Sequence, residues 1–391
     1  MDSRTAIRAD IDIASGRIRK LVPADSSEPP DEIPAAHVDF KNYLILPGLI
    51  NAHDHLEFNL FPRLGNGPYA NYEDWANDIY RPDRSPLLEH LSIPKHVRLW
   101  WGGIKNLLCG VTTVCHHNPY EEAVFGGEFP VRVLRRYGWA HSIAFEKDLP
   151  LAFRSTETGA PFILHLAEGT DERSKDEIFA LNRLGALDCR TVIVHGVGLT
   201  ADGHALRRQK GASLVWCPTS NRFTIGATID ARSICLEEKV ALGSDSALTA
   251  RGDLLDEIHA ANNEEGVDAD AVYAMVTESA AAILRLRDGE GRIQVGSVAN
   301  LIAVREQDAS PAETLVQADL SQIELVLIAG KPQLLSAEMV RRWPQSLLEG
   351  FEWITVEGTR RMVRAPIGHL LAEVSRYLSA PVRLAGKEIS I

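Results

Sequence analysis

The chain has 391 residues, of which 45% are hydrophobic and 24% are charged, so it can bury a large core. Its net charge of −12 argues against nucleic acid or an anionic membrane as the principal partner, because both would repel it. The five cysteines include no CxxC pair, which argues against a disulfide framework or a cysteine zinc site and is typical of a reducing cytosol.

The first residues lack the apolar stretch of a secretory signal, and no apolar run reaches the roughly 18 residues that a membrane span needs. We therefore expect a cytoplasmic protein with a small-molecule substrate, no nucleic-acid partner and no membrane association.

Both ends of the chain are rich in short β segments. Alternating apolar residues over 6–22, broken by a turn at Ser15-Gly16, predict two strands, and a Pro-rich loop follows over 23–34. Comparable segments return late, at 292–295, 301–304 and 325–328. The sequence predicts one small β-sandwich domain formed from residues 1–46 and 290–335.

The middle of the chain, residues 47–289, has a different rhythm. Short apolar runs alternate with helical segments, which is typical of parallel βα units. Each run ends in or is followed by a polar residue, where barrel enzymes place their chemistry. The clearest runs are 111–115, 163–166, 191–194, 213–216 and 240–242. The predicted fold class is therefore α/β, a (β/α)₈ TIM-type barrel.

One wall of this barrel has too few residues for a complete set of strands and helices. If residues 140–145 form the third strand and 162–166 the fifth, only 16 residues remain between them. A helix, a strand and a second helix do not fit in that length, so either the fourth strand is degenerate or this strand count is wrong. In both cases we expect a barrel that is irregular at this wall.

The last part of the chain, 336–391, resembles an appended extension. Residues 353–356 and 361–363 flank Glu357-Gly358 as a predicted hairpin, and apolar residues then repeat at helical spacing from Ile367. We expect this amphipathic helix to pack against the barrel or a second subunit.

The strongest local signal is His53-Asp54-His55, at the end of an apolar segment. Residues i and i+2 of a strand face the same side, so both imidazoles can reach one ion. His165, His195 and Asp245 each end or follow another apolar run, and Glu168 lies three residues after His165. Any one of these could be a buried, hydrogen-bonded polar residue, but four successive strand ends of this kind predict a metal site.

The order of these motifs resembles the amidohydrolase superfamily over about residues 5–335, in particular the branch with guanine, S-adenosylhomocysteine and cytosine deaminases and the triazine hydrolases. The matching stretches are LPGLINAHDH (46–55), GVTTV (110–114), HLAE (165–168), HG (195–196), CPTSN (217–221), LGSD (242–245) and GRIQVGSVANL (291–301).

The resemblance implies that His53, His55, His165 and Asp245 hold one divalent metal ion. It further implies that Glu168 is the proton shuttle, and that His195 and Asp245 orient the attacking water. Imidazoles with a carboxylate suit Zn²⁺, which we expect, with Fe²⁺ as the alternative. Two-metal relatives carry a bridging lysine that is missing here, since Lys147 is better explained as a surface residue. Relatives are commonly dimers, so we expect a homodimer.

Several further residues are candidate substrate contacts. His116 and His117 follow the second strand and could either line the pocket or support the ligands from behind. Trp75 lies in an aromatic loop that could stack a flat ring or seal a subunit interface. The remaining candidates are Glu57 and Asn221, and Arg222 and Arg251, which could neutralise an anionic group or form surface ion pairs.

Three functions are compatible with these motifs. The first is hydrolytic deamination of an amino-substituted heterocycle, and the second is cleavage of a cyclic or linear amide, or displacement of another leaving group, at the same site. The third, a non-catalytic relative, is disfavoured because such proteins have typically lost metal ligands, whereas all four candidates are present here.

Overall fold

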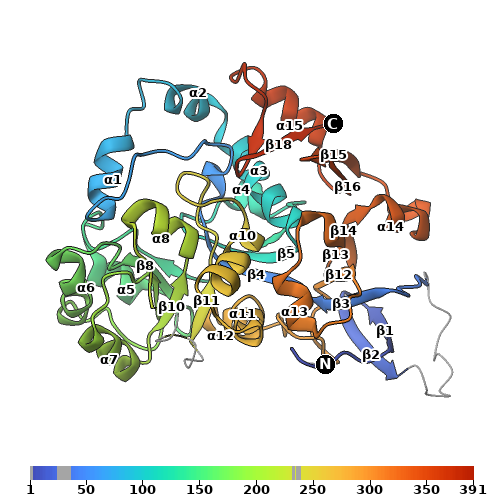
Figure 1. Ribbon diagram of the computed structural model, residues 1–391, viewed down its shortest axis with the longest axis horizontal. Helices are drawn as coiled ribbons and strands as arrows, with labels where there is room; N and C mark the ends of the chain where they lie inside the picture. Colours follow the sequence, from blue (N-terminus) through green and yellow to red (C-terminus); the bar gives the residue numbers. More distant parts are fainter. Residues whose placement is uncertain (1–2, 24–36, 231–233, 235–238) are drawn as a thin grey trace.

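The computed structural model describes residues 3–23, 37–230, 234 and 239–391. The predicted Pro-rich loop over 23–34 lies largely outside these residues, and Cys235, one of the five cysteines, lies wholly outside them. Figure 1 shows parallel strands surrounded by helices on one side of the molecule and a large antiparallel sheet on the other. No helix in the described part of the chain is long and apolar enough to cross a bilayer.

Eight short strands run parallel along the middle of the chain. They pair as a three-stranded sheet in the order β4-β5-β6 and a five-stranded sheet in the order β11-β10-β9-β8-β7. Six are buried along their whole length, as expected for parallel strands covered by helices. Their bounds are β4 Leu49–Asp54, β5 Val111–His116, β6 Arg132–Val133, β7 Gly138–Trp139, β8 Phe162–Leu166, β9 Thr191–His195, β10 Ser213–Trp216 and β11 Val240–Leu242.

The third and fourth parallel strands differ from the prediction. The third is β6 and the fourth is β7, each two residues long, so residues 140–145 are not a strand and instead follow β7 as turns. Neither strand carries an apolar run long enough to be recognised in the sequence. The prediction that this wall is irregular therefore holds, but the fourth strand is shortened and not absent.

The helices begin and end at local sequence signals. Helix α7 begins after Thr200, whose side chain accepts a hydrogen bond from the Gly203 amide, and ends at Gly211 with φ of 73°. The helices are α1 Tyr72–Ile79, α2 Leu87–Ser92, α3 Lys95–Leu108, α4 Glu122–Phe125, α5 Leu149–Ser155, α6 Glu172–Arg183, α7 Ala201–Lys210, α8 Pro218–Ile225, α10 Leu254–His259, α11 Ala269–Met275, α12 Glu278–Ile283, α13 Pro311–Val316, α14 Ala337–Arg342 and α15 Ile367–Val374.

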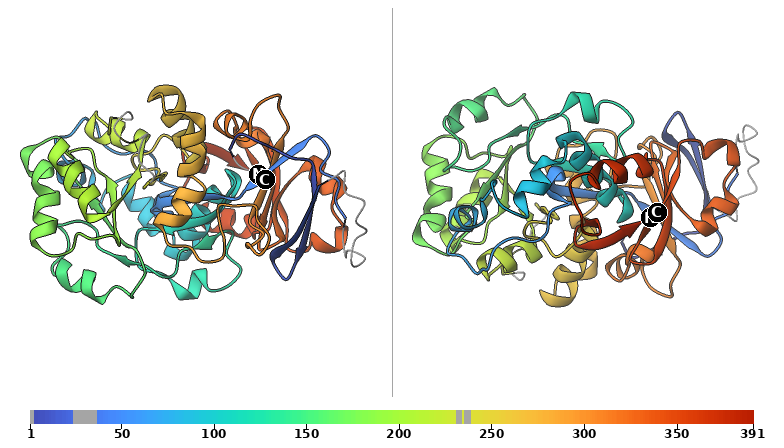
Figure 2. Two further views of the ribbon diagram at one scale, coloured as in Figure 1. Left: turned by 90° about the horizontal axis from the view of Figure 1, so that it is seen from below. Right: turned by 90° about the horizontal axis from the view of Figure 1, so that it is seen from above.

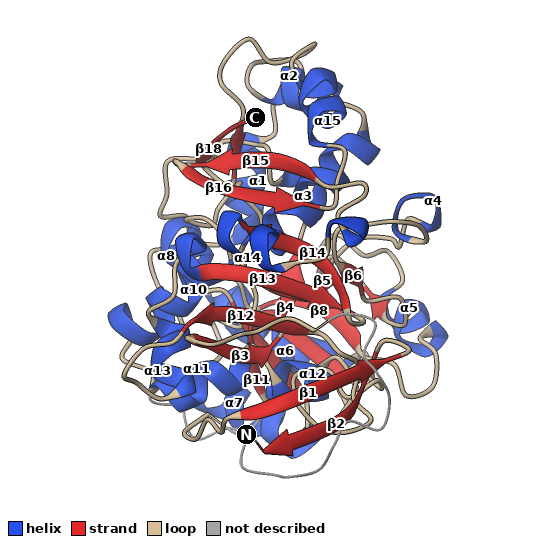
Figure 3. Ribbon diagram, turned by 90° about the vertical axis from the view of Figure 1, so that its right-hand side faces the viewer, coloured by secondary structure: helices blue, strands red, loops and turns tan. Residues whose placement is uncertain are grey.

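The antiparallel sheet joins distant parts of the chain. Strand β3 pairs with β12, so a segment before the parallel strands lies beside one that follows them, and the ladder continues to β18 and β17 (Figures 2 and 3). A separate hairpin, β1 Ala9–Ala14 with β2 Arg17–Pro23, lies at the N-terminus. The other strands are β3 Tyr43–Pro47, β12 Leu301–Arg305, β13 Ile323–Ile328, β14 Lys331–Ser336, β15 Glu352–Val356, β16 Thr359–Val363, β17 Arg383–Leu384 and β18 Lys387–Ser390.

The C-terminal extension continues this sheet and also contacts the loops that follow two parallel strands. The Ala385 amide donates to the carbonyl of Asn59, four residues after His55. Lys387 forms ion pairs with Asp253 and Asp256, which together make the capping box of α10. The extension thus ties the segments after His55 and Asp245 to the sheet.

We expect Lys387→Met to lower the free energy of unfolding by about 3 kcal/mol, because it leaves the carboxylate of Asp253, 3% exposed, without its cation. Arg383→Met is the matched control. Its pair with Glu388 spans 3.5 Å with both side chains 58% exposed, so its loss should cost no more than about 1 kcal/mol. Urea unfolding measures both free energies, and equal losses in the two variants would contradict the stabilising role of the Lys387 ion pairs.

Candidate metal centre and its cavity

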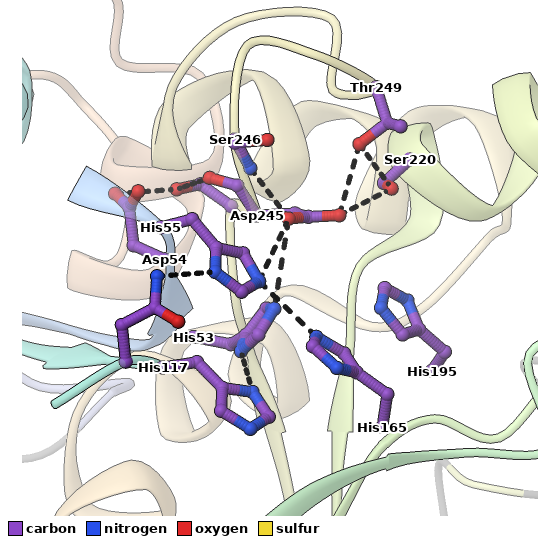
Figure 4. A network of polar contacts seen from close by, with 12 residues as sticks. His53, Asp54, His55, His117, His165, His195, Ser220, Asp245, Ser246 and Thr249 are labelled. Carbon is purple, nitrogen blue, oxygen red and sulfur yellow. Dashed lines mark hydrogen bonds and ion pairs between the residues drawn. The ribbon is translucent and has the colours of Figure 1, made fainter. Parts of the chain in front are cut away.

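The ends of three strands bring the four predicted metal ligands together (Figure 4). His53 is in β4 and His165 in β8, and His55 and Asp245 follow β4 and β11. The Nε2 atoms of His55 and His165 are 3.3 Å apart. The Asp245 Oδ1 atom is 3.7 Å from Nε2 of His53 and 3.9 Å from Nε2 of His55. Three imidazoles and one carboxylate therefore face a common point.

The chemistry of this donor set fits a divalent ion. Nε2 of His53 is buried and has no hydrogen-bond partner, although it faces the cluster. Burial holds the pKa values of His55 and His165 well below their usual value, so both rings are neutral, as ligands must be. Both oxygens of the Asp245 carboxyl group accept hydrogen bonds, as those of an ionised carboxylate do. An unpartnered imidazole nitrogen beside an ionised carboxylate is what a zinc-type site requires.

Neighbouring side chains hold the Asp245 carboxylate in place. Oδ2 accepts hydrogen bonds from the hydroxyls of Ser220 (2.7 Å) and Thr249 (3.0 Å), and Oδ1 accepts from the Ser246 amide (2.7 Å). Ser220 belongs to the CPTSN stretch, which therefore positions a ligand. Strand ends that carry function also have unusual backbones, since φ is 54° at Ala167, 73° at His195 and 51° at Asp245. Non-glycine residues adopt this left-handed region uncommonly, although several turns outside the cluster in this chain do so as well.

His117 supports His53 from behind. Its Nε2 lies 2.9 Å from the carbonyl of Ala140, which can only accept, so this nitrogen carries the proton. In the neutral ring Nδ1 is then an acceptor, and it lies 3.2 Å from Nδ1 of His53. His53 must donate through Nδ1, which leaves its Nε2 lone pair free for an ion. His117 is thus engaged on both nitrogens, although it also lies within reach of the cluster.

We expect His117→Leu to weaken metal affinity by about 10–100-fold, the usual loss when an outer hydrogen-bond partner of a ligand is removed. His117→Asn, whose amide oxygen can accept near the former Nδ1 position, should lose less. Competition with a chelator measures both affinities. Equal losses in the two variants would mean that His117 acts through packing and not through the hydrogen bond.

Asp54, between the two histidines, points away from the cluster. Its carboxylate is 2.8 Å from the buried Lys105 Nζ and accepts hydrogen bonds from Asn106 (2.7 Å) and Asn59 (2.8 Å). Lys105 also donates to Ser244, next to Asp245. Because successive side chains of an extended segment point to opposite sides, His53 and His55 face the cluster and Asp54 faces away from it. Asp54 thereby joins a network that links the segments around His53 and Asp245.

Glu168 and His195 face one another across the cluster. The Glu168 Oε2 atom is 3.6 Å from Nε2 of His195, and Nδ1 of His195 pairs with Oδ1 of Asn221 at 2.8 Å. Because an amide oxygen only accepts, His195 carries its proton on Nδ1 and presents a free lone pair on Nε2. Burial raises the pKa of Glu168 to about 7, so this carboxyl group can hold a proton at neutral pH and release it.

A cavity opens onto this cluster. Of the seven candidate substrate contacts only Trp75 belongs to its described lining. Nε2 of His116 lies 3.6 Å from Oε2 of Glu57. His117 contacts His53, and Asn221 contacts His195, as described above. The cavity is lined by His55, Phe58, Tyr72, Trp75, Ala76, His141, Phe145, His165, Glu168, His195, Asp245, Ser246, Leu248 and Thr249.

His141 is a cavity residue that the sequence analysis missed. Its carbonyl accepts from Nδ1 of His165 at 2.7 Å, and its ring contacts those of Tyr72 and Phe145. Burial lowers its pKa to about 4, so the ring is neutral. The signal was present, because His141 follows the short strand β7 as the other histidines follow theirs, but β7 itself was not recognised.

Parallel strands with a histidine–carboxylate cluster at their carboxyl ends are typical of metal-dependent hydrolases. Residues 140–332 match the model of the amidohydrolase family. The chain is therefore similar to the amidohydrolase family over these residues.

Named relatives cover almost the whole chain. A 5-methylthioadenosine/S-adenosylhomocysteine deaminase from Thermococcus sibiricus is 24% identical over 85% of this chain and 91% of the relative, and one from Pyrococcus furiosus is 23% identical over 90% and 96%. A zinc-bound adenosine deaminase from Xanthomonas campestris superposes with a TM-score of 0.66 at 18% identity, covering 94% of this chain and 92% of that one. A mutant of atrazine chlorohydrolase from Arthrobacter aurescens, complexed with zinc and atraton, gives a TM-score of 0.70 at 15% identity, covering 94% of this chain and 95% of that one.

Proposed function

We propose that this protein hydrolytically deaminates an amino-substituted heterocycle, with one divalent ion, Zn²⁺, held by His53, His55, His165 and Asp245. The observation that carries this proposal is the unpartnered, buried Nε2 of His53, which faces Asp245 in a cluster of neutral imidazoles. The relatives named as deaminases support the reaction type.

The chemistry that such an ion supplies is activation of water as a nucleophile at neutral pH. The protein's own groups do the rest. Glu168, with its raised pKa, takes a proton from the water and delivers it to the ring nitrogen or the leaving amine. His195, fixed by Asn221, and Asp245, fixed by Ser220 and Thr249, orient the water. The ring of Trp75 stacks on the flat substrate.

Elemental analysis together with an ammonia-release screen tests this proposal. We expect about one metal ion per chain and stoichiometric ammonia from at least one aminated heterocycle. Metal-containing protein that cleaves amides and releases no ammonia from heterocycles would replace deamination by amide hydrolysis. Protein without metal after purification with native ions would remove the enzymatic function.

We further propose that the eight parallel strands close into a barrel that is irregular at β6 and β7. Strands β3 and β12 to β14, with the β1–β2 hairpin, would form the small sandwich domain, residues 1–46 and 290–335, beside the barrel of 47–289. The extension of 336–391 would add its strands to the same sheet. A cytoplasmic homodimer without a nucleic-acid partner remains the proposal that charge, cysteine content and family resemblance support.

A further inference from the structure

The cavity that opens onto the metal cluster is small. Its volume is about 120 Å³. An apolar cavity of about 150 Å³ is known to accept benzene, whereas pockets for drug-sized ligands measure about 300–1,000 Å³. A single ring fills this space, so an attached sugar would have to project beyond it.

The outer wall of the cavity is held in place by hydrogen bonds. The Tyr72 amide donates to the carbonyl of Glu168 at 3.0 Å, and the neighbouring Asn71 forms an isolated bridge with Gly169. The Asn71 side chain donates to Asp171 at 2.7 Å, and the Trp75 indole donates to the carbonyl of Leu64 at 2.9 Å. The segment that carries the aromatic lining is therefore tied directly to the strand end that carries the proton shuttle.

The remaining walls are flat and apolar. Phe58, Tyr72, Trp75, Phe145 and Leu248 surround the space opposite the cluster. The Tyr72 hydroxyl is already paired with Ser142 at 2.9 Å and is not free for a substrate. Such walls favour an aromatic ring held by stacking.

No lysine or arginine is among the described residues that line the cavity. Three arginines that lie near these motifs in the sequence have their partners elsewhere. Arg63 donates to the carbonyl of Ala250, and Arg222 and Arg251 form ion pairs with Glu265 and Glu264 outside the lining. Away from the proposed metal ion, the described lining therefore offers no cation that could pair with a carboxylate on the substrate.

We propose that the substrate is a compact, uncharged, amino-substituted single ring that carries neither a sugar nor a carboxylate. This inference rests on the proposed deamination, because it concerns the same site. It separates this chain from the curated relatives, whose names specify nucleosides, one of them bearing an aminocarboxylate tail.

Paired substrates test the proposal on the metal-loaded enzyme. We expect ammonia release from a single-ring panel of cytosine, melamine and 2,4-diaminopyrimidine, with a kcat/KM for the best of them at least about 100-fold above those for cytidine, adenosine and S-adenosylhomocysteine. Turnover of a nucleoside or of S-adenosylhomocysteine as fast as that of the best ring would overturn the proposal.

Binding to metal-loaded Glu168→Gln protein, followed by calorimetry, separates this inference from the proposed reaction. Preferential binding of single rings without ammonia release from the wild type would reject deamination and keep the size and charge limits. Failure of every single ring to bind, or tighter binding of nucleosides, would reject those limits.

A substitution in the cavity wall tests whether the wall causes the selectivity for single rings. Phe145 lines the cavity and is 52% exposed, so Phe145→Ala should open the wall at little cost in stability and reduce the discrimination against cytidine by at least ten-fold. Leu151→Ala is the matched control, because Leu151 is also 52% exposed but lies outside the lining. The same change in both variants would show that the wall does not set the selectivity.

Discussion

Glu168→Gln is expected to lower kcat by about 10²–10⁴-fold, the usual contribution of a positioned general acid or base. Glutamine preserves the shape of the side chain but can neither accept the proton from water nor deliver it. Metal content should remain at the wild-type value, because Glu168 lies opposite His195 and outside the four-residue donor set. Steady-state ammonia release and elemental analysis measure the two quantities on the same protein.

Glu324→Gln is a suitable control for this experiment. Glu324 is buried to a similar extent, with 2% exposure, but it pairs with Arg305 in the antiparallel sheet. Its replacement should leave kcat close to that of the wild type. Substantial turnover by Glu168→Gln, or loss of metal from it, would remove Glu168 from the role of proton shuttle.

His165→Asn is expected to weaken metal binding by more than the roughly 10–100-fold that the loss of an outer partner costs, because it removes a direct donor. Activity should fall with metal occupancy. Stability should change as well, since an ion present at 100 times its Kd adds about 2.7 kcal/mol to the free energy of unfolding. The Tm of the wild type should therefore rise with added zinc, and that of His165→Asn should not.

His204→Asn is the matched control for metal binding. His204 is also a largely buried histidine whose pKa burial lowers, to about 4, but it lies on α7, apart from the cluster. It should keep full metal content and the zinc-dependent rise in Tm. An unchanged zinc response in His165→Asn would show that position 165 is not a ligand.

The sequence was informative where an apolar run ended in a polar residue. Full-length apolar strands such as β8 and β9 were visible as runs, and the polar residues at their ends could be grouped because parallel strands end at one edge. His53, His55, His165 and Asp245 were collected in this way. Strands β6 and β7 were not visible, because two residues carry no period, and His141 was missed along with them.

The remaining site could be described only from the tertiary structure. Whether His117 contacts substrate or a ligand depends on which neighbours its two nitrogens meet, and Ala140 and His53 are distant in the chain. Charge partners raise the same difficulty, since Arg222 and Arg251 turned out to pair with Glu265 and Glu264.

By itself the sequence determined the α/β class with parallel strands, the identity of the metal-ligand candidates and the expectation of a hydrolase. The fold class and the polar strand ends follow from periodicity and residue chemistry, which are local properties of a chain. The choice of four ligands and the hydrolase expectation follow from the family resemblance. The small cavity, the absence of cations among its described lining and the tautomers of the supporting histidines were decided by tertiary structure. They depend on distances and on burial between residues far apart in sequence, and those quantities exist only after the chain has folded.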